Sequence, residues 1–180
     1  MHNVFRNEKL DPLKFEGQNF IAYKGKCPIN VKTDGLILKL YKHFRKAVDN
    51  PIELSYNNKS AGQFISTWNV EKNLHKWREL QPFVQWIESQ FENHKITEMW
   101  ANVTEPNGYL KNHNHLGHKF AGTLYLEAKE NCGDIIMHNF CKGRIQEGDV
   151  IIFDGGITHK TQVNNSGHDR IVIAFTLDEI

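Results

Sequence analysis

Apolar residues recur at helical spacing in two segments of the first half of the chain. The first segment carries them on one helical face, at Leu36, Ile37, Leu40, Tyr41, Phe44 and Val48. Asp34 is a suitable N-cap for this segment, and Pro51 is a suitable stop. We therefore predict a helix between these two residues.

The second helical segment covers residues 73–94. Its apolar positions recur at steps of three and four residues, at Trp77, Leu80, Val84, Ile87 and Phe91, with Phe83 at the edge of the stripe. Pro82 lies inside this segment, where a proline kinks a helix or splits it in two. A stripe of this kind is typical of a helix that packs on a hydrophobic core.

After residue 96 apolar and polar positions alternate, which is typical of strands. The expected strands are 97–104, 109–112, 120–127, 134–138, 149–153, 160–163 and 170–176. So many short strands predict a barrel or jelly roll, with the two helices covering one outer face of a sheet. We expect one domain over 1–180, mainly β with α, in which 1–96 is helical and 97–180 forms the β core.

Composition limits the partners and the cellular setting. With 22 basic and 21 acidic residues the net charge is +1, so neither nucleic acid nor an anionic membrane is indicated as a partner. Cys27, Cys132 and Cys141 form no CxxC pair, and a reducing cytoplasm suits them better than a disulfide framework. We find neither a signal peptide nor a run of roughly 18 apolar residues that could span a bilayer. A homodimer stays among the expected assemblies.

Histidines are concentrated in the second half of the chain. Five of the ten lie between His113 and His159. Residues two apart on a strand share a face, so His113 and His115 are expected to aim their imidazoles at one point, where zinc, copper, iron or nickel could bind. His118 is expected on a turn, as a rim residue of the same site.

His159 follows an apolar strand and the pair Gly155-Gly156. Glycine adopts backbone angles that other residues avoid, so we expect a sharp bend that places His159 beside the first two histidines. If 164–167 closes a hairpin, Arg170 points from the same face as His159. An inward arginine needs an anion, and a carboxylate would suit its planar fork.

This layout suits a 2-oxoglutarate oxygenase, in which the keto acid chelates Fe(II) and its far carboxylate meets a cation. From Trp100 to Phe175 the chain resembles the Fe(II)/2-oxoglutarate-dependent oxygenase superfamily. It is most similar to a family of uncharacterised oxygenases common in marine phages and bacteria. The resembling segments are Trp100-Ala-Asn-Val, His113-Asn-His115, Ala121-Gly-Thr-Leu-Tyr125-Leu, Gly148-Asp-Val-Ile-Ile-Phe153, His159 and Arg170-Ile-Val-Ile-Ala-Phe175, with Trp68 and Asn73-Leu74 before them.

The resemblance implies a double-stranded β-helix and a role for each matching residue. His113 matches the first histidine of the superfamily's HxD motif, and His159 matches its distal histidine. Arg170 matches the arginine that binds the 2-oxoglutarate C5 carboxylate, and Tyr125 matches a position that donates a hydroxyl to it. Asn102 and Thr123 match positions that line the pocket.

The chain departs from the superfamily where the carboxylate ligand is expected, because His115 stands there. His115 completes a three-histidine site in the interpretation we favour. Asp134 or Asp154 could instead supply a carboxylate from another strand, or the site could hold its metal with two histidines and an open position. A neutral third ligand would leave the metal more positive.

The resemblance implies an enzyme that uses Fe(II), 2-oxoglutarate and O2 and releases succinate and CO2, most often while hydroxylating a second substrate. The sequence leaves that substrate open, as a small molecule or a macromolecule. Two rivals remain. One is a cupin-like three-histidine dioxygenase that uses no 2-oxoglutarate, and the other is a non-catalytic ligand-binding jelly roll, such as a phage module.

Overall fold

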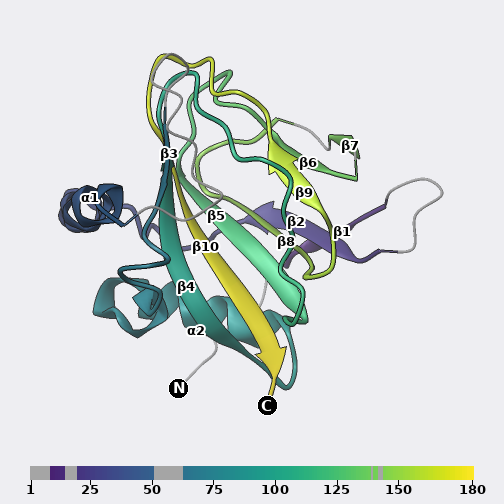
Figure 1. Cartoon of the computed structure of the whole chain (residues 1–180). Coiled ribbons are helices and arrows are strands. Elements are labelled where there is room, and N and C mark those ends of the chain that lie inside the picture. Colours follow the sequence, from purple (N-terminus) through teal and green to yellow (C-terminus); the bar gives the residue numbers. More distant parts are fainter. Residues whose placement is uncertain (1–8, 15–19, 51–62, 139, 142–143) are drawn as a thin grey trace.

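The protein folds into two antiparallel sheets that face each other. Residues 9–14, 20–50, 63–138, 140–141 and 144–180 are described in a computed structural model. The seven-stranded sheet contains, in chain order, β1 (Asp11–Leu13), β2 (Ala22–Lys26), β3 (Phe64–Ser66), β4 (His94–Thr104), β5 (Phe120–Glu127), β8 (Asp149–Asp154) and β10 (Arg170–Glu179). Its spatial order is β1-β2-β8-β5-β10-β4-β3. The small sheet has the order β7 (Phe140–Cys141), β6 (Ile135–Met137), β9 (His159–Thr161), and Figure 1 shows it at one side of the large sheet. This is the expected double-stranded β-helix.

Helix α1 (Asp34–Val48) lies along the outer side of the large sheet. Its N-cap is Thr33, whose hydroxyl accepts a hydrogen bond from Leu36 N at 3.1 Å, and not Asp34, which is the first helical residue. Leu36, Leu40 and Phe44 are buried as predicted, whereas Val48 is 47% exposed and was wrongly placed on the buried face. The helix ends at Val48, and Pro51 lies outside the described residues.

The second predicted helix is divided. Two short 3₁₀ turns, Leu74–Lys76 and Arg78–Leu80, precede helix α2 (Gln81–Gln90). Pro82 lies in the first turn of α2, where its missing N–H costs no hydrogen bond, so the helix begins there. The helix is shorter than the predicted 73–94, and β4 already begins at His94.

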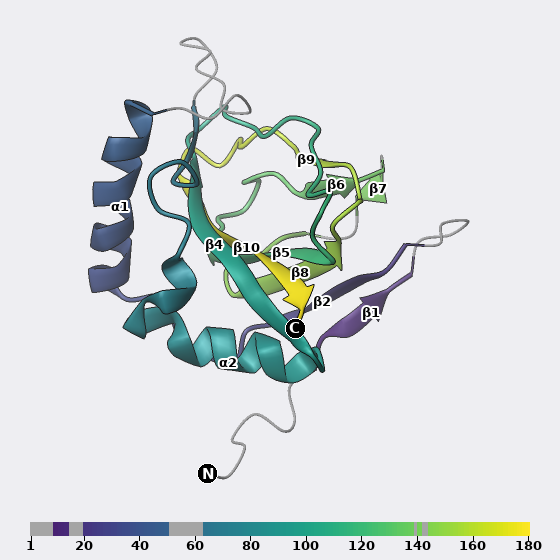
Figure 2. The same cartoon turned by 60° about the horizontal axis from the view of Figure 1, so that its bottom comes forward.

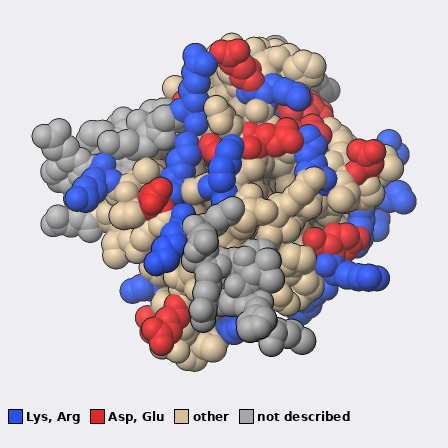
Figure 3. Space-filling view, turned by 180° about the vertical axis from the view of Figure 1, so that it is seen from behind, with Lys and Arg blue, Asp and Glu red and all other residues tan. Residues whose placement is uncertain are grey.

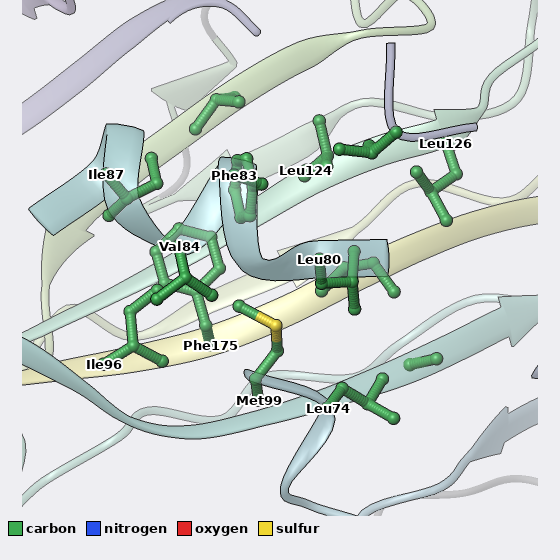
Figure 4. Close-up of a cluster of buried hydrophobic side chains, with 14 of the residues drawn as sticks. Leu74, Leu80, Phe83, Val84, Ile87, Ile96, Met99, Leu124, Leu126 and Phe175 are labelled. Atoms are coloured by element: carbon green, nitrogen blue, oxygen red, sulfur yellow. The ribbon is translucent and has the colours of Figure 1, made fainter. Parts of the chain in front are cut away.

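Both helices cover the same face of the large sheet, opposite the small sheet, as Figure 2 shows. Figure 4 shows Phe83 and Val84 of α2 directed at Phe175 of β10 and Met99 of β4. The rings of Phe83 and Phe175 meet edge to face, with centroids 5.6 Å apart. Gly122 of β5 makes room for this packing, because a Cβ there would come within 3 Å of the Phe175 ring.

The strands of the large sheet alternate between this core and the opposite face. On β10, Ile171, Ile173, Phe175 and Leu177 are in the core, and Arg170, Val172, Ala174 and Thr176 line a cavity between the two sheets. The register aligns Asn102 of β4 and Tyr125 of β5 with Val172. Period-two alternation thus separates the residues that hold the fold from those that face the cavity.

Several sequence predictions about strands are corrected. The amino-terminal half, residues 1–96, is not purely helical, because it contributes β1, β2 and β3 to the large sheet. Residues 109–112 form no strand. Strands β9 and β10 do not form a hairpin: β9 pairs with β6 in the small sheet, and β10 pairs with β4 and β5. Strand β5 matches its predicted range of 120–127.

The surface agrees with the near-neutral composition. On the face seen in Figure 3, Lys and Arg side chains are interspersed with Asp and Glu, and no single-sign field covers it. No helix among the described residues is long and apolar enough to cross a membrane.

Candidate metal and ligand site

Three histidines converge at one point in the cavity. The ligand nitrogens of His113, His115 and His159 all lie within 4.8 Å of one another, and these residues are the cluster of potential metal ligands found among the described residues. The ring centroids of His113 and His159 are 4.1 Å apart, and that of His115 lies 5.2 and 5.3 Å from them. Three neutral imidazole nitrogens at such distances suit a transition-metal ion.

Backbone hydrogen bonds fix the positions of these histidines. His113 and His159 exchange N–H···O=C bonds of 3.0 and 2.9 Å, so the loop 112–114 is attached to the start of β9. His115 N donates to Gly155 O at 2.8 Å. The predicted two-residue spacing therefore brings the imidazoles together, although the segment is a loop held by β9 and the turn after β8 and is not a strand.

The hydrogen bonds of two rings also fix which nitrogen faces the cavity. Nδ1–H of His113 donates to Lys111 O at 2.9 Å, and Nδ1–H of His159 donates to Ile157 O at 3.0 Å. A carbonyl can only accept, so these contacts assign the proton to Nδ1 and leave each Nε2 lone pair for a metal. Carbonyl partners of this kind orient metal-ligating histidines.

The electrostatics of the cluster favour neutral imidazoles. Burial lowers the pKa of all three rings, and the mutual repulsion of their charged forms lowers the pKa values of His115 and His159 further. The pKa of His115 falls to about 3, and that of His159 falls well below its ordinary value. The rings are therefore ready to bind a metal at neutral and mildly acidic pH.

We predict that the metal-free protein loses stability as the pH falls from 7 to 5. In the unfolded chain the three histidines become protonated near pH 6.5, whereas in the folded protein their lowered pKa values keep them neutral. The unfolded state therefore binds more protons below that pH. His115 alone should cost about 1–2 kcal/mol at pH 5. Urea unfolding at the two pH values measures this loss, which His115→Gln should reduce. Equal stability of the wild type at both pH values would disprove buried neutral histidines.

The turn before His159 needs glycine because glycine has no side chain, and not because the backbone angles are unusual. Neither Gly155 nor Gly156 has a left-handed φ, so the predicted conformational reason is wrong. A Cβ at Gly155 would lie 2.2 Å from His118 O and 2.9 Å from His115 O. Gly155 is therefore needed because the backbone of the loop 112–119, called the histidine loop below, packs directly on it.

Gly155→Ala is expected to displace this loop and to destabilise the protein by roughly 2–3 kcal/mol, the upper range for overpacking, because the clash is with backbone. It should also weaken metal binding. Gly156→Ala is the matched control, since a Cβ there meets only the Asp154 side chain at 3.4 Å and the Leu116 tip at 3.9 Å. Thermal unfolding and metal titration of both variants check this. Equal effects at the two positions would contradict it.

The alternative carboxylate ligands lie elsewhere. Asp134 Oδ1 accepts a hydrogen bond from Ile145 N at 2.9 Å, beside a second, polar hollow. Asp154 Oδ1 accepts from Gly156 N at 2.9 Å. Neither belongs to the metal-ligand cluster, which includes His115. His118 lines the cavity without joining the cluster, so its predicted rim position agrees with the structure.

The cavity measures about 550 Å³ and continues from the histidines to Arg170. Asn102, Thr123 and Tyr125 line it, as the resemblance implies. Two buried oxygens, Asn102 Oδ1 and Thr123 Oγ1, have no hydrogen-bond partner among the described residues. Burial raises the pKa of Tyr125, so its phenol stays protonated. These groups fit a polar ligand, because buried polar atoms are costly without partners.

Arg170 is a buried cation, only 2% exposed, at the far end of this cavity. Its Nη1 donates to Cys132 O and Gly133 O, both at 2.8 Å, and its Nη2 donates to the hydroxyls of Thr104 and Thr161, both at 3.0 Å. No carboxylate among the described residues forms a salt bridge with it. Burial lowers the pKa of Arg170 below its ordinary value, yet a guanidinium stays charged at neutral pH. The end of the cavity is thus electropositive.

Thr104 and Thr161 were missed from the sequence. Thr161 Oγ1 accepts hydrogen bonds from both Leu110 N and Arg170 Nη2, at 2.9 and 3.0 Å. With both lone pairs engaged, its own O–H is available only as a donor. Thr161 lies two residues after His159, so β9 carries a candidate metal ligand and a hydroxyl donor whose Cα atoms are about 7 Å apart. Had the predicted strand begun at His159, Thr161 would have been expected on the same face as His159.

Comparisons with known proteins give a fold and no family. No protein-family model matches the chain, and no curated protein matches it. Several solved structures do match the chain. One is described as an oxidoreductase of the 2OG-Fe(II) oxygenase family from Burkholderia pseudomallei, with a TM-score of 0.51, 10% identity, and 87% of this chain and 84% of that chain covered. The chain shares its fold.

Two further neighbours were solved with ligands. The viral collagen prolyl hydroxylase from Paramecium Bursaria Chlorella virus-1, in its 2OG complex, has a TM-score of 0.51 and 12% identity, with 88% of this chain and 96% of that chain covered. The epimerase SnoN with Fe3+, alpha ketoglutarate and nogalamycin RO has a TM-score of 0.53 and 8% identity, with coverages of 87% and 78%. A hydroxylase and an epimerase on one fold show that the fold does not fix the reaction.

Proposed function

We propose that this chain is an Fe(II)- and 2-oxoglutarate-dependent dioxygenase. The observation that carries the proposal is the pairing, in one cavity, of three converging histidines with a buried arginine that has no carboxylate partner among the described residues. The shared fold of 2OG-Fe(II) oxygenases supports it. The resemblance to the phage and bacterial family remains a prediction.

His113, His115 and His159 would hold Fe(II) through their cavity-facing nitrogens. With 2-oxoglutarate and O2 bound, this centre supplies an oxidation in which the keto acid loses CO2 and becomes succinate while a second substrate is oxidised. The imidazoles of His113 and His159 are held in place by Lys111 O and Ile157 O. The cavity residues would orient both organic molecules, and hydroxylation is the outcome we propose.

Arg170, Thr104, Thr161 and Tyr125 would hold the far carboxylate of 2-oxoglutarate. The arginine's terminal N–H groups are engaged by protein oxygens, so a bidentate grip on the carboxylate is not the arrangement present. Instead the threonine hydroxyls would donate to the carboxylate, with the guanidinium charge directly behind them. Asn102 and Thr123 would line the path between this end and the metal.

Thr161→Val is expected to weaken 2-oxoglutarate binding by roughly 10- to 100-fold, because it removes a donor to a charged group. Thr161→Ser keeps the hydroxyl and should restore most of the affinity. Calorimetric titration of 2-oxoglutarate into the metal-loaded variants measures both. Equal loss in the two variants would show that the methyl group and not the hydroxyl matters.

A cupin-like three-histidine dioxygenase without 2-oxoglutarate is the second candidate. It is favoured by His115 at the usual carboxylate position and by the neutral protein partners of Arg170, which could make that arginine purely structural. The two functions differ in whether Arg170 is needed for keto-acid binding.

Turnover of 2-oxoglutarate tests the proposal. The purified chain with Fe(II) and 2-oxoglutarate in air should form succinate, and omission of iron, of 2-oxoglutarate or of O2 should abolish it. Zinc in place of iron is the matched control for metal binding without redox chemistry. Iron-loaded, folded protein that consumes no 2-oxoglutarate would contradict the proposal.

A further inference from the structure

The outer end of the cavity carries side chains that neither the metal nor the keto acid uses. They lie on β4, on the segment after β3 and on the histidine loop: Trp68, Asn69, Glu98, Leu116 and His118. Trp68 is 41% exposed and Leu116 is 75% exposed. Two large apolar side chains at the mouth of a cavity that also carries hydrogen-bonding groups are typical of a ligand site.

His118 presents one defined nitrogen. Its Nδ1 lies 2.8 Å from Asp178 Oδ2, and Asp178 also accepts hydrogen bonds from the Thr97 hydroxyl at 2.6 Å and from Lys119 N at 2.9 Å. An aspartate held by three donors accepts the Nδ1–H, so in the neutral form of the ring the acceptor is Nε2, on the side away from Asp178. Burial raises the pKa of Asp178, but these hydrogen bonds hold it below its ordinary value, in agreement with an ionised partner.

Trp68 is fixed in position although it is exposed. Its indole N–H donates to Glu98 Oε2 at 2.9 Å, and the other oxygen of Glu98 accepts from Lys72 Nζ at 2.5 Å. Lys72 Nζ also lies 5.0 Å from the centre of the Trp68 ring. An aromatic surface that is already immobilised can stack a second ring at little cost in conformational entropy.

The carboxylates of this end already have partners. Glu98 forms a salt bridge with Lys72, and Asp178 accepts hydrogen bonds from His118 and from two further donors. Within the described lining of the cavity, the buried cation is Arg170 at the opposite end. The outer end therefore offers apolar surface and a hydrogen-bond acceptor, while its carboxylates are already occupied by protein donors.

We propose that the outer end binds the primary substrate as a planar, uncharged aromatic ring that bears an O–H or N–H group. The ring would lie against Trp68 and Leu116, and its donor would bond to His118 Nε2. This identifies the substrate class of the site proposed above and rests on that function, with His118 as a positioning residue. A cavity of about 550 Å³, shared with the keto acid, suits a small molecule.

Three simple probes separate the two parts of this recognition. Phenol has a ring and a donor, toluene has the ring alone, and cyclohexanol has the donor on a non-planar ring. Each is titrated into 15N-labelled protein while the indole N–H signals of its four tryptophans are followed, the Trp68 signal being identified by its loss in Trp68→Phe. Phenol should shift the Trp68 signal saturably and bind roughly 3- to 10-fold tighter than either analogue.

His118→Ala should remove the preference for phenol over toluene while toluene binding is unchanged. His168→Ala, at an exposed site outside the cavity lining, should keep the preference. Backbone amide spectra of both variants check the fold, and His118→Gln, which keeps an acceptor, should regain part of the preference. Binding without metal or 2-oxoglutarate makes this test independent of turnover. Absence of a saturable shift at Trp68, or an intact preference in His118→Ala, would overturn the proposal.

Discussion

His159→Ala is expected to lower Fe(II) affinity by at least about 100-fold and to abolish the formation of succinate. His159 is 4% exposed, its Nδ1 is held by Ile157 O at 3.0 Å, and its ring packs 4.6 Å from that of Phe153. Loss of residues that merely orient a ligand costs 10- to 100-fold in metal affinity, so loss of a ligand should cost more. Anaerobic titration with Fe(II), followed by calorimetry, measures the change.

Two variants keep this experiment interpretable. His159→Gln retains more of the side-chain volume beside Phe153 and should lose metal binding too, so lost packing would not explain the result. His168→Ala replaces an exposed histidine outside the cluster and should bind iron as the wild type does. If His159→Ala binds Fe(II) with wild-type affinity in a folded protein, the three-histidine assignment is wrong.

Arg170→Met is expected to weaken 2-oxoglutarate binding by roughly 30-fold or more while Fe(II) binding is retained. Truncating one partner of a buried charge pair costs about 2–5 kcal/mol, because the other charge is left buried and unpaired. Arg170 faces the cavity from β10, away from the histidine cluster, so metal and keto-acid affinities should separate. Calorimetric titrations of Fe(II) and of 2-oxoglutarate measure the two affinities independently.

Arg170 also has a structural role that must be controlled. Its removal strands the carbonyls of Cys132 and Gly133, so Arg170→Met should unfold more readily. Arg170→Lys keeps the charge with fewer donors and should bind 2-oxoglutarate with intermediate affinity. Unchanged 2-oxoglutarate affinity in a folded Arg170→Met protein would favour the three-histidine dioxygenase that uses no keto acid.

Elements with a strong local pattern could be predicted from the sequence. The apolar stripe from Leu36 to Phe44 predicted helix α1, and the apolar run of residues 120–127 predicted the bounds of β5. These predictions succeed because the hydrophobic pattern that determines each element lies within the segment itself. The convergence of His113 and His115 also followed from their spacing, although loop contacts and not a strand hold them.

Features that depend on distant partners could not be predicted. Strand β2 reads Ala-Tyr-Lys-Gly-Lys and has little apolar pattern, and it is a strand because it pairs with β8, where Lys24 and Lys26 lie 3.2 and 2.7 Å from Asp149. The turn 164–167 suggested a local hairpin, whereas β9 and β10 belong to different sheets. Arg170 does donate a hydrogen bond to the Thr161 hydroxyl, but this bond joins the two sheets across the cavity.

The role of Gly155 could not be predicted from the sequence either. Its neighbours are the backbone oxygens of His115 and His118, which the sequence places far from it along the chain. The same holds for the partners of Arg170, the carbonyls of Cys132 and Gly133, since carbonyl contacts leave no signature in residue type. Such close backbone contacts determine the site and require the folded chain.

The most direct test of the central claim is anaerobic addition of 2-oxoglutarate to the Fe(II)-loaded protein, followed by visible absorption. If the histidines hold iron and the Arg170 end holds the far carboxylate, a weak charge-transfer band should appear and saturate at one equivalent of 2-oxoglutarate. Arg170→Met should require much more keto acid to reach the same band. Iron that binds fully while no band appears at any 2-oxoglutarate concentration would contradict the account.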